Sequence, residues 1–202
     1  MEQLQNTVTL RGSLLALPEF SHAHHGRRFY RFCLEVERLS GAVDLLPVVA
    51  GLEVLEQVDL TGGSMLRVEG QLRSHNFTDE SGRHLMIFVY ADSITAEEGP
   101  AINQVHLEGA VCREPTCRRT PLGRQICDMM LAVPRGCRRA DYLPCILWGS
   151  TALEAGACHT RDTVCIEGRF QSRIYTKLTE TGCEEHTAYE ISALRADFPP
   201  EE

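Results

Sequence analysis

Long apolar runs are absent from this 202-residue sequence, and none approaches the ~18 residues that a membrane-spanning helix needs. The first residues, MEQLQNTVTLRG, also lack the basic segment and apolar stretch of a secretory signal. We therefore expect a cytoplasmic protein that does not contact a membrane.

Recognisable catalytic motifs are absent too. The sequence contains no Gly-Lys-Ser/Thr phosphate-binding loop, no His-Glu-x-x-His and no Gly-x-Ser-x-Gly. The segment SHAHHGRR places His22, His24 and His25 together, but exposed turn histidines are commoner than metal ligands in such a segment. We expect a protein that is not an enzyme and has no cofactor.

Nine cysteines are present, and eight of them follow residue 110: Cys112, Cys117, Cys127, Cys137, Cys145, Cys158, Cys165 and Cys183. A secreted disulfide scaffold needs a short chain and an export signal. Cys145 in LPCILW and Cys165 in TVCIEG lie where a strand would bury a small apolar side chain, so reduced thiols are the simplest interpretation. A zinc site stays open, although Cys112 and Cys117 have no second pair at zinc-finger spacing.

The formal net charge of −8 is a weak argument against a protein that binds nucleic acid. Residues 1–101 carry eight Lys and Arg against fourteen Asp and Glu, whereas residues 102–202 carry twelve against fourteen. The second half also groups its cations around residues 118–124, 135–139 and 169–177. Since phosphate binding depends on the local field, the acidic total does not exclude this function.

The chain contains an internal repeat, seen as three pairs of segments in the same order at an offset of about 97 residues. The pairs are Asn6–Gly12 with Asn103–Gly109, Leu46–Gly51 with Leu143–Gly149, and Arg67–Phe77 with Cys165–Tyr175. The segment EEGPAI at residues 97–102 has the character of a linker. We expect two domains, residues 1–98 and residues 103–198.

Each repeat predicts five β-strands, which in the first repeat are VTLRGSL, RFYRFCLEV, LLPVVAG, MLRVEGQL and HLMIFVYADSI. A short helix is predicted between the third and fourth strands, at LEVLEQVDL and at STALEAG. This pattern favours an all-β protein of two tandem OB-fold five-stranded barrels. Gly12, Gly109, Gly70 and Gly168 interrupt strands where a small barrel must bend sharply.

The second repeat resembles the bacterial single-stranded DNA-binding proteins. The resemblance lies in NQVHLEG, RRTPLGRQ, LAVPR, DYLPCILWG, VCIEGRFQSRIYTK and YEISA, taken in that order. The first repeat shares NTVTLRG, LPVVAG and VEGQLRSHNF, and primosomal replication protein N is a relative with a similar start. The resemblance implies OB barrels that bind single-stranded DNA by stacking bases on aromatic side chains.

Carried over by position, the resemblance assigns stacking roles to Trp148, Tyr142 and Tyr175. In the first repeat only the last of these survives, as Phe77, because the Trp148 position falls on Ala50. The first repeat is therefore expected to have a degenerate binding face. A lone Trp in a strand is more commonly a core residue, and Phe77 lies near acidic residues, so these roles rest on the resemblance.

Tyr175 can also be argued from chemistry alone. An aromatic ring stacks on any base, and neighbouring cations hold the phosphates. Arg173, Tyr175 and Lys177 alternate along one strand and would project from the same face, with Arg169 further back. Arg118, Arg119 and Arg124 flank a Thr-Pro-Leu-Gly turn that is either merely solvated or guides phosphates. The predicted nucleic-acid-binding residues are Tyr142, Trp148, Arg169, Arg173, Tyr175, Lys177, Phe77, Arg73, Arg118, Arg119, Arg138 and Arg139.

Three functions remain open at this point. The favoured one is sequence-independent single-stranded DNA binding in replication, recombination or repair, at the nucleoid. The resemblance implies four barrels acting together, hence a homodimer, with replication or recombination proteins as further partners. The alternatives are an OB-fold assembly module of a primosome-like complex and a cysteine-rich metal-binding protein. Because ADFPPEE follows the last predicted strand directly, recruitment of partners through a long acidic tail is not expected.

Overall fold

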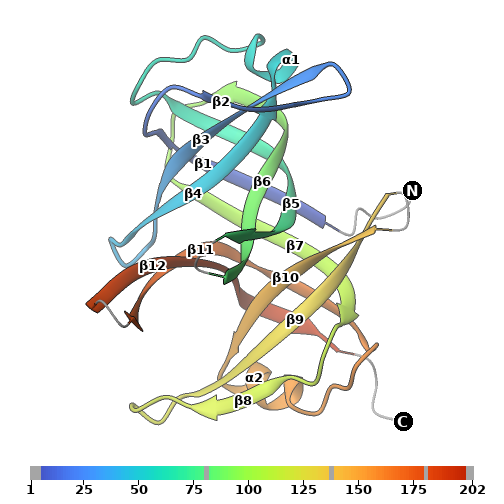
Figure 1. Ribbon diagram of the computed structural model, residues 1–202. Helices are drawn as coiled ribbons and strands as arrows, with labels where there is room; N and C mark the ends of the chain where they lie inside the picture. Colours follow the sequence, from blue (N-terminus) through green and yellow to red (C-terminus); the bar gives the residue numbers. More distant parts are fainter. Residues whose placement is uncertain (1–5, 80–81, 137–138, 180–181, 199–202) are drawn as a thin grey trace.

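The computed structural model describes residues 6–79, 82–136, 139–179 and 182–198, and their twelve strands form one continuous sheet that curls into two barrels (Figure 1). The first barrel comprises β1 (Asn6–Leu14), β2 (Glu19–His24), β3 (Arg27–Glu37), β4 (Val43–Gly51), α1 (Leu52–Leu55), β5 (Met65–Asp79) and β6 (Gly82–Ala96). The second comprises β7 (Ile102–Val111), β8 (Thr116–Arg119), β9 (Gln125–Arg135), β10 (Arg139–Trp148), α2 (Ser150–Ala155), β11 (Thr163–Thr179) and β12 (Gly182–Asp197). Within the described residues, no helix is long and apolar enough to span a membrane.

The alternation of apolar and polar residues explains the barrel strands. In β1, Val8, Leu10 and Leu14 point into the core, whereas the alternate residues Thr9, Arg11 and Ser13 are more exposed. The β7 strand of the second barrel repeats this pattern. Each barrel closes through a parallel pairing, β4 with β6 and β10 with β12. The five predicted strands and the helix between the third and fourth are present in both barrels, which confirms the fold class.

Each barrel carries one additional short strand that the hydrophobic pattern did not predict. These strands are β2, which pairs with β3, and β8, which pairs with β9. Every residue of both is exposed, so neither has an apolar face to produce an alternating pattern. They extend each barrel at its edge.

The four predicted strand glycines lie where two backbones approach closely. A Cβ at Gly70 would lie 2.1 Å from the carbonyl oxygen of Tyr90, and one at Gly168 would lie 2.5 Å from that of Ser192. The strand register shifts at both glycines. Side chains at these positions would push the paired strands apart where the barrel bends.

The two barrels join through antiparallel pairing of β1 with β7. Val8 lies opposite Val105, its equivalent in the repeat, so the two barrels are related by an approximate twofold axis between these residues. Inside each barrel one asparagine makes the same pair of hydrogen bonds. Asn6 donates to the Leu72 carbonyl and accepts from the Leu72 amide, and Asn103 does the same with Phe170.

A buried aspartate on each side also bridges the barrels. Asp44 of β4 accepts hydrogen bonds from the amide and hydroxyl of Ser172 in the second barrel, at 2.7 and 2.9 Å. Its equivalent, Asp141, accepts from the amide of Ser74 at 2.8 Å. Burial acts to raise the pKa of Asp44, but its hydrogen bonds with Arg38 and Ser172 outweigh it and hold that pKa below its usual value.

Candidate nucleic-acid interface

The outer face of β10 presents a row of aromatic and apolar side chains. Asp141, Leu143, Cys145 and Leu147 of this strand are buried in the barrel. The residues that alternate with them lie on the other face, where Ile146 is covered but Tyr142 and Trp148 are 42% and 39% exposed. A partly exposed ring on a strand is the kind of side chain on which a base can stack.

The long β11–β12 hairpin presents the third predicted aromatic. Tyr175 is 40% exposed, and its ring stacks on His186 of β12 with centroids 5.6 Å apart. The guanidinium of Arg173 lies 5.6 Å from the Tyr175 centroid and 3.5 Å from a carboxylate oxygen of Glu190. The structure therefore brings Arg173 and Tyr175 together. Lys177 belongs to β11, but its side chain lies outside the described residues.

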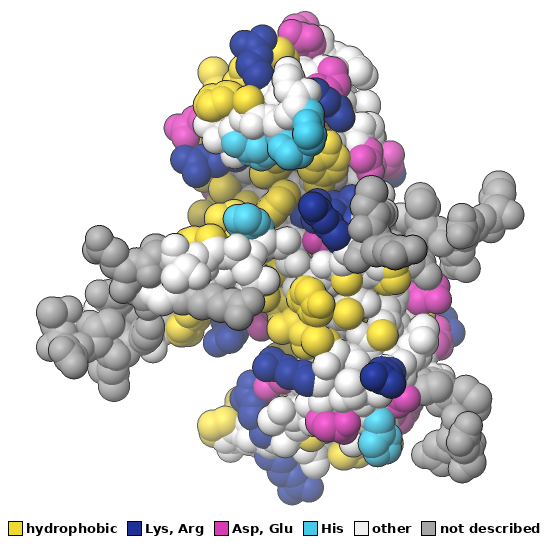
Figure 2. All heavy atoms as spheres, turned by 45° about the vertical axis from the view of Figure 1, so that its right-hand side comes forward, with side chains coloured by type: hydrophobic (Ala, Val, Ile, Leu, Met, Phe, Trp, Pro, Cys, Tyr) yellow, Lys and Arg dark blue, Asp and Glu magenta, His cyan; other side chains and the backbone are white. Residues whose placement is uncertain are grey.

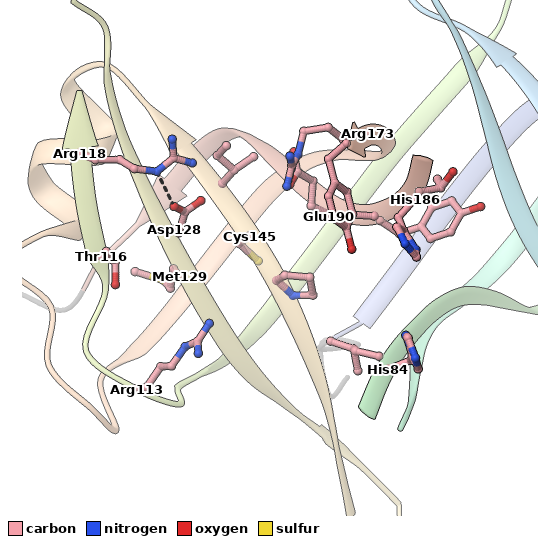
Figure 3. A pocket seen from close by; sticks show the side chains of 17 residues that line it. His84, Arg113, Thr116, Arg118, Asp128, Met129, Cys145, Arg173, His186 and Glu190 are labelled. Carbon is pink, nitrogen blue, oxygen red and sulfur yellow. Dashed lines mark hydrogen bonds and ion pairs between the residues drawn. The ribbon is translucent and has the colours of Figure 1, made fainter. Parts of the chain in front are cut away.

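A groove of about 680 Å³ connects these elements (Figure 3). One end is lined by Arg118 of β8, whose Nε lies 3.0 Å from Asp128 of β9. The other end is lined by Arg173, Tyr175 and His186 of the second barrel and by His84 of the first. The groove thus joins the arginine-bearing edge of the second barrel to the hairpins of both barrels.

The space-filling view shows the same arrangement of side-chain types. Hydrophobic side chains gather in the middle of the second barrel's face in Figure 2, and Lys and Arg side chains lie above and below them. This face contains the right-hand side of Figure 1, where β9 and β10 lie. An apolar surface bordered by cations suits a strand of stacked bases with an outer phosphate chain.

The remaining predicted arginines fall into three groups. Arg119 and Arg139 are exposed, and Arg169 is half-buried on β11. Arg73 belongs to the bridge between the barrels, with its guanidinium 3.2 Å from Asp141 and 5.9 Å from the ring of Tyr90. Arg138 lies outside the described residues.

The first barrel has a different surface at the equivalent positions. Phe77 is 36% exposed and stacks on His84 at 5.1 Å and His75 at 6.5 Å. Ala50 is fully buried in the core. The strand pairing places Gly51 opposite Phe29, as Trp148 lies opposite Ile126, so the Trp148 position falls on Gly51 and not on Ala50. The alignment from sequence was wrong by one residue because the extra residue of the second repeat comes after the strand.

Two sets of aromatic contacts were not found from the sequence. The first is the cross-strand histidine beside each hairpin aromatic, His84 beside Phe77 and His186 beside Tyr175. The second is Phe20 on β2, which is 56% exposed and packs edge-on against Tyr30. The segment EFSHAHHGRRFYRF contained the signal for the second set, since its aromatics and cations are interleaved.

The metal-binding alternatives gain no support from the geometry. His22, His24 and His25 are all exposed on β2 and its turn. In the part of the chain that the structure describes, no three His, Cys, Asp or Glu residues are grouped to hold a metal ion. Cys145 is buried as predicted, and burial raises the pKa of its thiol. Cys165 is half-buried.

Comparison with known proteins shows which proteins the chain resembles. Residues 102–199 match the Single-strand binding protein family. Single-stranded DNA-binding protein B of Bacillus subtilis is 35% identical over 80 residues, which cover 36% of this chain and 71% of that protein. Single-stranded DNA-binding protein 2 of Listeria innocua is 32% identical over 81 residues, and the match spans about half of it, 51% of its length.

The similarity to a solved structure extends over both barrels. The wild-type single-stranded DNA-binding protein from Thermus aquaticus superposes with a TM-score of 0.78 at 25% identity, covering 98% of this chain and 94% of that one. The chain therefore belongs to the single-strand binding protein family, with two OB barrels in one polypeptide.

Proposed function

We propose that this protein binds single-stranded DNA without sequence preference, mainly through the second barrel. The observation that carries the proposal is the set of exposed aromatic side chains, Tyr142 and Trp148 on β10 and Tyr175 on β11, beside a groove lined by Arg118 and Arg173. Stacking of a base on such a ring contributes about 1–3 kcal/mol and tolerates any base. The arginines supply phosphate contacts that tolerate any sequence as well.

We also propose a cellular role for this binding. Coating of single strands would support replication, recombination or repair at the nucleoid.

We propose a homodimer, in which two chains supply four barrels. A solution mass of about twice the 22.6 kDa of one chain, measured by light scattering, is the expected result. A mass equal to one chain at the working concentration contradicts the homodimer.

Fluorescence titration with oligo-dT tests the binding. Trp148 is the only tryptophan, so stacking of a base on it should quench a single, assignable signal. Affinities of variants are then measured by anisotropy of a labelled oligo-dT, because Trp148→Ala removes the intrinsic signal. Trp148→Ala and Tyr175→Ala should each weaken binding about 5- to 150-fold. Leu153→Ala, which alters an exposed apolar side chain on α2, is the control and should bind as the wild type does.

A second candidate function is supported by the first barrel. There Gly51 and Leu45 occupy the positions of Trp148 and Tyr142, so the face lacks two of the three stacking rings. Residues 1–101, the half of the sequence that forms the first barrel, also carry most of the net negative charge. Such a face suits docking of another replication protein. Absence of both quenching and anisotropy change with oligo-dT would favour this assembly module over strand binding.

A further inference from the structure

Cys117 and Cys127 face each other across the β8–β9 hairpin. They are direct partners in the strand register, and their Sγ atoms lie 2.6 Å apart. A disulfide bond is about 2.05 Å long and is compatible with the Cα separations of directly opposed strand residues. The two sulfurs therefore need to approach by only about 0.5 Å to bond.

The two thiols have unequal access to solvent. Cys127 is fully buried, whereas Cys117 belongs to an edge strand whose residues are all exposed. Cys117 Sγ lies 3.5 Å from the Ala152 carbonyl oxygen at α2. Gly156 leaves room for it, since a Cβ there would come within 2.9 Å of the sulfur. The packing thus holds the Cys117 sulfur between the helix and Cys127, in a residue that is itself exposed.

The structure assigns Cys117 and Cys127 as a redox pair that forms a reversible intramolecular disulfide. A low-molecular-weight disulfide is the oxidant. The Cys117 thiolate attacks it, forms a mixed disulfide and releases the first small thiol. Cys127 then attacks Cys117 Sγ, which releases the second small thiol. The protein loses two electrons and two protons, and both are recovered in the two small thiols.

The order of these steps follows from burial. Burial, together with the neighbouring Cys117, raises the pKa of Cys127 to about 12, which disfavours its attack on an external disulfide. Cys117 is the accessible sulfur and reacts first. The resulting ring encloses the loop that carries Arg118, Arg119 and Arg124. Oxidation would fix that arginine loop to β9, next to Trp148, whose strand partner is Ile126.

Peptide mapping of the full-length protein tests the pair directly. The reduced protein is incubated with oxidised glutathione, the remaining thiols are alkylated, and the sample is digested with trypsin without reduction. Trypsin separates Cys117, on Glu114–Arg118, from Cys127, on Gln125–Arg135. The expected product is these two peptides joined, two hydrogens lighter than their sum and separated by dithiothreitol.

Matched variants and a second readout complete the test. Cys112→Ser, which removes a nearby exposed thiol, should leave the joined peptide unchanged, and Cys117→Ser should abolish it. Oxidation should raise the thermal unfolding midpoint of the wild type by several degrees and leave that of Cys117→Ser unchanged. A glutathione adduct on Cys117 with Cys127 alkylated would overturn the proposal. So would a link from Cys117 to Ala140–Arg161, the peptide of Cys145 and Cys158.

Discussion

At the scale of single residues, the two hairpins offer an internal comparison. Phe77 and Tyr175 occupy equivalent positions, and each ring stacks on the histidine opposite it. They differ in the residue two positions earlier in the strand. Arg173 places its guanidinium over the Tyr175 ring, whereas His75 stacks beside Phe77. Under the proposed function, we expect the permanent cation next to the Tyr175 ring to contact a phosphate while the ring stacks on the base.

Substitution of these two rings should therefore have unequal effects. Tyr175→Ala should weaken oligo-dT binding about 5- to 150-fold, because a stacking platform contributes about 1–3 kcal/mol. Phe77→Ala is the matched change in the first barrel and should cost less, since it lacks the arginine. Anisotropy titrations of both variants at one salt concentration give the comparison. Equal losses would show that the two hairpins contribute equally.

The sequence indicates candidate residues of this site but not the side chains that contact them. Trp148, Tyr142 and Tyr175 were singled out because their positions in the second repeat resemble a known pattern; all three are exposed, and their role in binding stays a prediction. The partners of a side chain could not be found, because they come from strands distant in the chain. Arg73 resembles any exposed cation in sequence, yet its guanidinium pairs with Asp141 of the other barrel.

At the scale of elements, β4 and β10 do more than close their barrels. Each carries an aspartate that is about 1% exposed or less and bonds across to the other barrel. Asp44 is also ion-paired with Arg38, which donates a hydrogen bond to the Ser172 carbonyl as well. A buried carboxylate with such partners stabilises the joined barrels only while it is ionised.

Asp44→Asn should destabilise the protein by about 2–3 kcal/mol at pH 7, because Arg38 and Ser172 lose their charged partner. The folded-state pKa of Asp44 lies below the unfolded value of about 3.9. The ionised carboxylate therefore makes its full contribution to the free energy of unfolding above about pH 5. That contribution is lost as the pH falls through the folded-state pKa. Urea unfolding of both proteins at pH 7 and pH 3 should show the difference shrinking at pH 3. If the difference in unfolding free energy between the two proteins is the same at pH 7 and pH 3, Asp44 does not stabilise the protein through its charge.

Strand prediction succeeded and failed for one physical reason. A strand that buries one face, such as β1, shows alternation because water is excluded from that face only. The β2 and β8 strands bury no residue and depend on backbone pairing with β3 and β9, which sequence patterns do not reveal. The helix prediction over LEVLEQVDL was too long, since α1 covers only Leu52–Leu55.

At the scale of the whole molecule, the two repeats share the same barrel framework but differ in their exposed side chains. The β1–β7 pairing, the asparagine hydrogen bonds and the aspartate bridges all occur twice. Two of the three exposed rings do not, because Leu45 and Gly51 replace Tyr142 and Trp148, and the second half also carries more of the Lys and Arg. We therefore expect a chain with a net charge of −8 to attract phosphates locally, on the second barrel.

The salt dependence of binding distinguishes phosphate contacts from base stacking. For single strands the slope of log affinity against log salt is about 0.7 per phosphate contact. Arg119→Ala combined with Arg139→Ala removes two exposed cations and should make the slope shallower by up to about 1.4. Trp148→Ala should lower affinity at every salt concentration and leave the slope unchanged, because stacking releases no counterions. Titrations across a series of salt concentrations measure both. An unchanged slope in the double arginine variant would show that these two arginines do not contact phosphates.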